Sequence, residues 1–438
     1  MNPIAILSLL AALALSNSAF AAGRYFEVNY PPSTQPGELQ FAVTYTLWLP
    51  DGAKTLRGII VHQHGCGTGA CKGGETAAYD LHWQALAKKW DCALLGPSYH
   101  QGEKDNCRLW CDPRNGSEKT FLKSLADFAK QSGHTELDKV PWCLWGHSGG
   151  GFWSSLMLTL HPDRIAAIWL RSGSAFGAWE KDEIPKPQLT PAVYEVPLMF
   201  NGGIKEESDQ RHGPARVADR AMFKAWREHG SPAAFATDPR TSHECGDSRY
   251  LAIPFLDACL AMRLPEKGAA TQQLRPVDLK PAWLAPIPGD EAKPASSFSG
   301  NAAEACWLPN EQIAKAWSEY VKTGATSDTT PPPAPTNVKT VSKTDGIEIT
   351  WEAGADFESG IQAFIIQRDS KDLAQSPQKP VGKFGRPLFQ QMSYHDTPEK
   401  PLPEMKFTDT TAKPGERHEY RIITVNGVGL KSTPAAAR

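Results

Sequence analysis

The sequence predicts an α/β fold, a mostly parallel sheet with helices on both faces, followed by a small all-β domain. Apolar strand-like runs alternate with helical runs from about residue 56 to residue 262, the order that covers parallel strands with helices. After residue 335 the apolar period changes to alternation, as in residues 346–351 and 420–425, which is typical of a sandwich. A chain of 438 residues is long enough for two or more domains.

The elements of the α/β domain, residues 23–325, follow from hydrophobic period and turn residues. Two early extended segments, 25–29 and 40–49, are expected to form an antiparallel edge. Helices are predicted at 75–90, 117–132, 149–160, 213–229, 247–262 and 311–322. Residues 264–309 lack a clear period, and we expect them to wrap the domain surface, tied down through Cys306.

Composition and the N-terminal segment indicate an exported protein. Residues 4–15 are apolar and are followed by the small residues expected before a cleavage site, so residues 1–22 are predicted to be a signal peptide. The predicted location is therefore the periplasm or the medium, without a transmembrane anchor. The 46 basic and 48 acidic residues give a net charge of -2, which argues against nucleic acid as a partner and favours a neutral or weakly charged substrate.

The segment Gly146-His147-Ser148-Gly149-Gly150-Gly151 carries the strongest chemical signal. It follows the apolar run 142–145 and leads directly into an apolar helix, the context that a nucleophile elbow requires. Small neighbours let strand and helix approach each other while the Ser148 hydroxyl stands out of the sheet. The backbone amide of Gly149 would then point toward a developing oxyanion.

A second apolar strand, 58–63, ends in the glycine-bearing loop His64-Gly65-Cys66-Gly67. With the serine motif, it makes the chain resemble the α/β-hydrolase superfamily over residues 25–324. The loop is similar to that of secreted polyhydroxybutyrate depolymerases and feruloyl esterases. The resemblance implies that the Cys66 amide is the second oxyanion donor. Tannase-like esterases place cysteines directly before the serine and after the histidine, where this chain has His147 and Glu244, so that disulfide is not expected.

The remaining triad members should follow the serine in the order acid, then histidine. Residues 196–203 form a predicted strand that ends in a charged loop, and Glu206 is the first choice for the acid, with Glu207 and Asp209 as alternatives. His243 lies in the loop after the last predicted strand, 233–237, where the general base belongs. Residues 171–195 are expected to form an insertion over the active site that sets substrate selectivity.

The other histidines and the cysteines have expected structural roles. His62 and His64 form an H-x-H pair, but the sequence supplies no suitably spaced further ligands, so neither a metal nor another cofactor is expected. We expect His161, His212 and His229 to face solvent. An oxidising compartment would allow disulfides among the nine cysteines, and Cys66, Cys71, Cys107 and Cys111 lie where they could pin the oxyanion loop.

Residues 326–334 are rich in Thr and Pro and are predicted to be a stiff linker. Residues 335–438 resemble a fibronectin type III domain, with Trp351 as its core tryptophan, Tyr420 near the start of the sixth strand, and 425–429 as the following turn. Such a module would act as a spacer or would contact a polymer or cell surface.

These observations predict a secreted serine esterase that works through an acyl-enzyme and needs no cofactor. Ser148, His243 and Glu206 would form the triad, and Cys66 and Gly149 the oxyanion hole. The expected substrate is an ester, with polymeric and plant-derived esters as the candidates. Two alternatives stay open, a peptidase of the same fold and a non-catalytic surface-binding protein.

Overall fold

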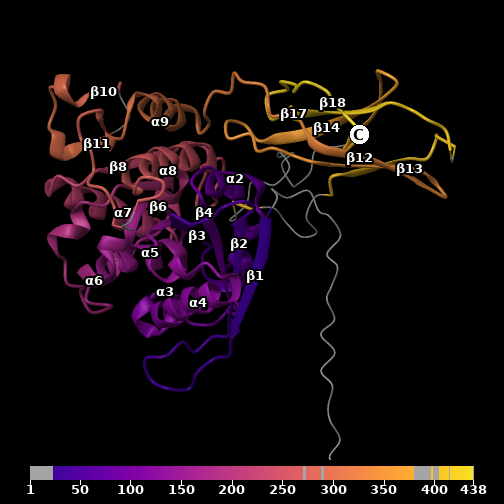
Figure 1. Ribbon diagram of the computed structural model, residues 1–438. Helices are drawn as coiled ribbons and strands as arrows, with labels where there is room; N and C mark the ends of the chain where they lie inside the picture. The colour runs from indigo at the N-terminus through magenta and orange to yellow at the C-terminus, as the bar shows by residue number, and fades with distance from the viewer. Residues whose placement is uncertain are drawn as a thin grey trace, which may run out of the picture.

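The structure of the protein is a computed structural model that describes residues 23–269, 273–287, 291–378, 396–397, 404–413 and 415–437. The predicted signal peptide, residues 1–22, lies outside the described residues. Figure 1 shows an α/β part and, beside it, a smaller all-β part that contains the C-terminus. Among the described residues, every helix falls short of the length and hydropathy that spanning a bilayer would require.

An eight-stranded sheet forms the centre of the α/β part (Figure 1), in the order β1-β2-β4-β3-β5-β6-β7-β8. From β4 to β8 across the sheet all neighbours are parallel, whereas β2 runs antiparallel to both β1 and β4. The predicted mostly parallel sheet with an antiparallel edge is confirmed. Its strands are β1 Gly23–Tyr30, β2 Val43–Pro50, β3 Gly58–Gln63, β4 Cys92–Tyr99, β5 Trp142–His147, β6 Ile165–Arg171, β7 Leu198–Gly203 and β8 Ala233–Asp238.

Helices cover both faces of this sheet, which is why its inner strands are buried along their whole length. Every residue of β3, β5, β6 and β7 is buried, as expected for parallel strands between two helical layers. Helix α8 contacts β6, α2 and α9, while α5 contacts β5 and β6 and α7 contacts β7 and β8 (Figure 1). The helices are α1 Lys72–Glu75, α2 Leu81–Lys89, α3 Arg108–Cys111, α4 Ser117–Ser132, α5 Gly149–Leu160, α6 Phe176–Glu180, α7 Gly213–Glu228, α8 Arg249–Arg263 and α9 Glu311–Thr323.

The single helix expected at 75–90 is wrong, because the chain turns at Thr76–Asp80 and starts a new helix. The Asp80 side chain accepts hydrogen bonds from the backbone N–H groups of His82 and Trp83, which caps α2. Before this turn, α1 packs tightly against β4: a β-carbon at Gly73 would lie 2.2 Å from the Pro97 oxygen. The close packing of α1 on β4 and the Asp80 cap of α2 together divide the expected helix into two.

The stretch 264–309 contains more regular structure than its sequence predicts. Strands β9 Trp283–Pro286, β10 Lys293–Pro294 and β11 Ala305–Leu308 form a small antiparallel sheet in the order β10-β9-β11. Cys306 fastens it to the main sheet without a disulfide, because its sulfur accepts a hydrogen bond from the backbone N–H of Phe235 in β8 (3.2 Å).

The all-β part consists of a three-stranded and a four-stranded sheet, in the orders β12-β13-β16 and β15-β14-β17-β18. Trp351 and Phe364 meet in its core with ring centroids 5.2 Å apart, and buried Tyr420 donates a hydrogen bond to Asp409. The strands are β12 Thr336–Lys343, β13 Gly346–Glu352, β14 Ile361–Arg368, β15 Lys371–Ser376, β16 Lys406–Asp409, β17 Tyr420–Asn426 and β18 Ala435–Ala436.

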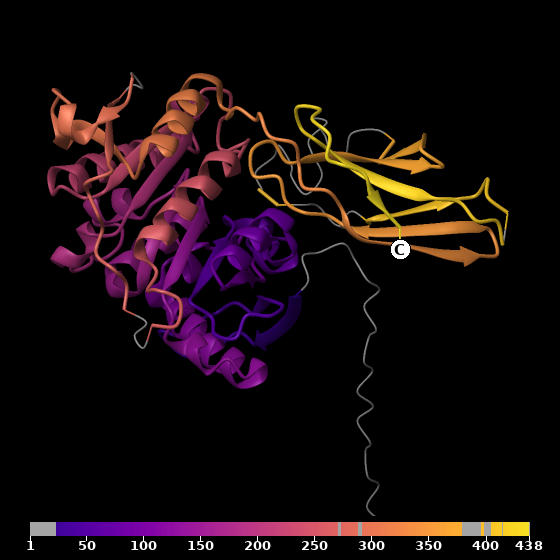
Figure 2. The ribbon, with the colours of Figure 1, turned by 45° about the horizontal axis from the view of Figure 1, so that its top comes forward.

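The two parts share buried contacts and lie side by side in both views (Figure 2). Leu81, the first residue of α2, belongs to the hydrophobic core of the all-β part. Arg249 of α8 pairs with Asp80 (2.7 Å) and with Asp396 (2.9 Å), and all three side chains are fully buried. The segment predicted as a stiff linker is also held: the Thr330 hydroxyl donates to Glu358, and Ser327 donates to Glu319 of α9.

Candidate active site

Ser148 occupies a strained turn between β5 and α5. Its backbone has a φ of 54° and a ψ of -115°, a conformation that side-chain-bearing residues rarely adopt. The Ser148 N–H donates to the Arg171 carbonyl at the end of β6 (2.8 Å), and the turn places Gly149 at the first position of α5. The geometry is that of a nucleophile elbow.

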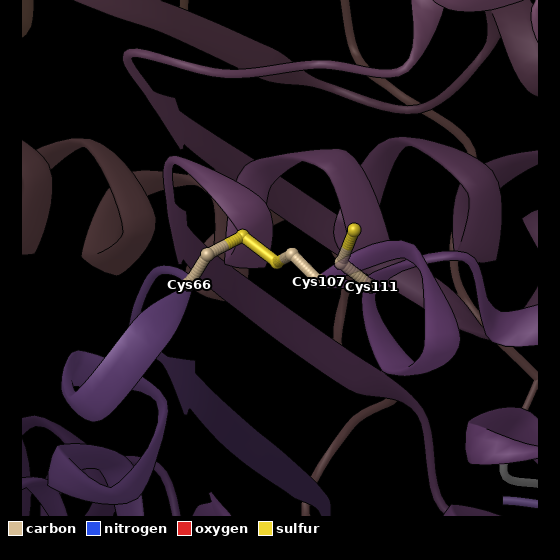
Figure 3. A group of neighbouring side chains, drawn as sticks. All are labelled: Cys66, Cys107 and Cys111. Atoms are coloured by element: carbon tan, nitrogen blue, oxygen red, sulfur yellow. A yellow bond between two sulfur atoms is a disulfide. The ribbon is translucent and has the colours of Figure 1, made fainter. Parts of the chain in front are cut away.

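A disulfide between Cys66 and Cys107 lies directly beside this turn. Figure 3 shows it joining the loop after β3 to the start of α3, with Cys111 next to the pair. A β-carbon at Gly149 would lie 2.2 Å from the Cys66 sulfur and 3.3 Å from the Cys66 backbone nitrogen. The Cys66 loop and the first turn of α5 therefore touch, and only glycine fits at residue 149.

His243 and Glu206 form a buried hydrogen-bonded pair. The distance between His243 Nδ1 and Glu206 Oε1 is 2.6 Å, and both side chains are almost completely buried. Glu206 lies in the short helical turn η7, Ile204–Ser208, after β7, and its other carboxylate oxygen accepts a hydrogen bond from the Ser172 hydroxyl (3.1 Å). The carboxylate thus fixes which ring nitrogen of His243 carries the hydrogen.

The other two carboxylates considered for the triad bind elsewhere. Glu207 is half exposed and pairs with Arg216 of α7 at 3.2 Å. Asp209 accepts hydrogen bonds from the backbone N–H groups of Arg211 and His212 and pairs with the His212 ring. Of the three, Glu206 is the carboxylate that hydrogen-bonds His243.

Two buried side chains hold the His243 loop in place, and neither was identified from the sequence. The Arg171 guanidinium donates to Asn201 Oδ1 (3.0 Å), to the Ser242 carbonyl (3.1 Å) and to the carbonyl of Glu244. His147, directly before the serine, donates from Nε2 to the His243 carbonyl (2.9 Å). The sequence did contain a signal for Arg171, because this residue ends the apolar strand β6 and a buried charge must be hydrogen-bonded.

The surroundings favour the neutral form of His243. Burial, then the charges of His212 and Arg171, lower its pKa from 6.5 to about 3. Burial raises the pKa of Glu206, while Arg171 and the Ser172 hydroxyl lower it in part. A neutral imidazole is the form that can accept a proton from a hydroxyl.

Ser148 and His243 face the same cavity, which has a volume of about 260 Å³. Its wall is mostly polar and consists of Gly65, Cys66, Thr68, Gly69, Glu103, His147, Ser148, Arg211, His212 and His243. These lining residues include none from the insertion at 171–195, so the expectation that this segment covers the site is wrong. The expectation that His212 faces solvent is wrong as well, because its ring stacks on His243 with centroids 3.9 Å apart.

The predicted pair His62 and His64 is fully buried, with ring centroids 5.0 Å apart. His62 stacks on Trp145 of β5 at 3.9 Å, and His64 Nε2 lies 3.4 Å from the Thr397 hydroxyl. These contacts make both histidines part of the packed interior.

No protein-family model matches the sequence, and the comparison with curated proteins found no match. Solved structures similar to this chain include an acylaminoacyl peptidase from Pyrococcus horikoshii, with a TM-score of 0.39 and 11% identity over 54% of this chain and 41% of that one. An S-formylglutathione hydrolase from Agrobacterium tumefaciens has a TM-score of 0.37 and 16% identity over 56% of this chain and 95% of that one.

A feruloyl esterase module from Clostridium thermocellum has a TM-score of 0.34 and 14% identity over 56% of this chain and 89% of that one. The chain spans less than half the length of the peptidase. Likeness at this level carries no information on substrate.

Proposed function

We propose that this protein is a serine hydrolase of the α/β-hydrolase type that cleaves carboxylic esters. One observation carries the proposal: the buried His243–Glu206 hydrogen bond of 2.6 Å lies at the wall of the cavity that also contains Ser148 on its strained turn. A serine, an imidazole and a carboxylate in one cavity are the parts of a nucleophilic triad. We assign Ser148 as nucleophile, His243 as base and Glu206 as the orienting acid.

In the proposed acylation step, Ser148 Oγ attacks the ester carbonyl while its proton moves to Nε2 of His243. Glu206 stabilises the resulting imidazolium through Nδ1–H without taking the proton itself. The tetrahedral intermediate then collapses: the C–O bond to the alcohol breaks and His243 returns the proton to the leaving oxygen. Water repeats the sequence on the acyl-enzyme and regenerates Ser148.

The backbone N–H groups of Cys66 and Gly149 are assigned to the oxyanion. Their support is the close approach of the two segments, since a β-carbon at residue 149 would lie 3.3 Å from Cys66 N. Removing one such donor typically slows turnover about 10²- to 10³-fold. The disulfide to Cys107 holds the Cys66 amide in its place beside the helix.

We further propose that the protein is exported and that its all-β part is a fibronectin type III-like domain. The apolar leader and the Cys66–Cys107 disulfide support export, because disulfides persist in oxidising compartments. The three-plus-four strand arrangement with Trp351 in its core supports the domain type. We also propose that this domain contacts a polymer or a cell surface.

Active-site labelling tests the assignment. A fluorophosphonate should label the purified protein, and Ser148→Ala should abolish both labelling and ester hydrolysis. Ser132→Ala, at the end of α4 and outside the cavity, serves as the matched control and should label like the wild type. Persistent labelling in Ser148→Ala would refute the assignment of Ser148 as the nucleophile. Parallel ester and amide panels separate an esterase from a peptidase, and we expect turnover of esters to dominate.

A further inference from the structure

His212 stands directly before α7 and lies against the face of His243. The two rings are nearly parallel, with an interplanar angle of 14° and centroids 3.9 Å apart, and the His212 side chain is only 15% exposed. The short segment from Glu206 to His212 therefore contacts His243 twice. Glu206 binds the Nδ1 edge of the ring, and His212 covers one of its faces.

Asp209 fixes the orientation of His212. Its Oδ2 lies 3.1 Å from His212 Nδ1, and its Oδ1 accepts the backbone N–H groups of Arg211 (2.8 Å) and His212 (3.0 Å). The His212 side chain and these amides lower the pKa of Asp209 to about 2, so the group is an acceptor at neutral pH and His212 Nδ1 must be the donor. Both the backbone and the ring of residue 212 are thereby held.

We propose that Asp209 and His212 form a second carboxylate–imidazole couple, which positions His243 by ring stacking and controls the acid side of the activity profile. This inference rests on the proposed function, because it assumes that His243 is the catalytic base. His212 is in this view a positioning residue, and its ring also forms part of the cavity wall.

The couple acts among several other groups that face His243. Arg171 approaches from β6 and the ring of His147 lies 5.0 Å away on β5, while Arg211 precedes His212. After burial, the charge of His212 is the largest influence that lowers the pKa of His243, followed by those of Arg171 and Arg211, whereas the Asp209 carboxylate raises it. A charged His212 opposes the imidazolium that forms when Ser148 loses its proton, whereas a neutral stacked ring does not.

Two substitutions separate the stacking from the charge. His212→Phe keeps an aromatic ring against His243 but removes the ionisable group, and His212→Ala removes both. The measurement is the second-order rate constant of fluorophosphonate labelling from about pH 2.5 to 8, which reports the activation of Ser148 without a substrate's own ionisation.

The acid limb is the part of the pH profile in which the labelling rate falls at low pH, as His243 becomes protonated. In His212→Phe the charge of His212 no longer lowers the pKa of His243, so we expect this limb to move to higher pH. The expected shift is about 0.7 unit or more, the value that two unit charges 4 Å apart give even in water. The plateau rate of His212→Phe should exceed that of His212→Ala, because the aromatic contact with His243 is retained. His212→Ala should lower the plateau about 2- to 10-fold, the range for loss of one aromatic contact. His229→Phe is the matched control, because His229 also stacks on a ring, that of Tyr194 at 4.0 Å, but lies outside the cavity.

An acid limb that is identical in His212→Phe and wild type would overturn the proposal, as would a plateau in His212→Phe as low as that of His212→Ala. Circular dichroism at each pH confirms that the variants are folded, and if His212→Ala does not fold, the His212→Phe limb alone decides. Failure of the proposed function has a different signature, since wild-type protein would then not be labelled at Ser148 at all.

Discussion

Gly149→Ala tests the contact between the Cys66 loop and the helix that follows Ser148. The new methyl carbon would lie 2.2 Å from the Cys66 sulfur and 3.0 Å from the Cys107 sulfur, whereas non-bonded heavy atoms prefer roughly 3.5 Å or more. The Cys66 loop or the start of α5 must therefore move by about 1.3 Å. A displacement near 1 Å at reacting groups can cost about 10²-fold in rate.

We expect kcat of Gly149→Ala to fall at least about 100-fold on a short-chain nitrophenyl ester, with a smaller change in KM, because the proposed oxyanion donors would act mainly in the transition state. The source of the loss can be isolated by a double-mutant cycle with Cys66→Ala and Cys107→Ala, which remove both sulfur atoms. In that background the fold-decrease in kcat caused by Gly149→Ala should be less than a tenth of the fold-decrease in the wild type. An equal loss in both backgrounds, or wild-type kcat in Gly149→Ala itself, would refute the packing argument.

Three further predictions concern the disulfide, a buried ion pair and His243. Cys107→Ser opens a disulfide that closes a 41-residue separation and should lower the free energy of unfolding by about 4 kcal/mol in urea titrations, with no such loss under reducing conditions, where the wild type lacks the bond as well. Asp396→Asn removes one of the carboxylates that pair with the buried Arg249 guanidinium and should lower the free energy of unfolding by about 3–5 kcal/mol. Lys89→Met breaks an exposed pair with Asp257 and should lower it by at most about 1 kcal/mol. Because folding lowers the pKa of His243 from 6.5 to about 3, the unfolded chain binds a proton in this window that the folded chain does not; stability should fall as pH drops through it, and the fall should be smaller in His243→Gln. A stability that is flat between pH 6.5 and 4 in the wild type would contradict the last expectation.

The parts of the fold that sequence could predict are those set by local pattern. The elbow at Ser148 combines an apolar strand, a glycine-flanked serine and an apolar helix in consecutive residues, so its position and its elements follow directly. The mostly parallel character of the sheet follows from alternating strands and helices. Glu206 was harder, because three carboxylates lie within four residues and the path of the η7 turn decides which one meets His243.

Long-range contacts account for what the sequence did not predict. His212 looks like a polar residue at a helix start, and only the return of the chain after β8 brings His243 onto its ring. The break at Thr76–Asp80 depends on close packing of Gly73 against β4, which no local propensity reports. Strands β9 to β11 are each two to four residues long, too short to produce a recognisable alternation.

The place of Leu81 limits how this chain can be divided. Its backbone starts a helix of the larger part, yet its side chain completes the apolar interior of the smaller one. Cutting the polypeptide near residue 325 would therefore uncover a leucine on one fragment and leave a vacancy in the other. Anyone wishing to graft the C-terminal module onto another protein would need to carry this anchoring point along, and recombinant fragments should aggregate unless position 81 is made polar and the vacancy is filled.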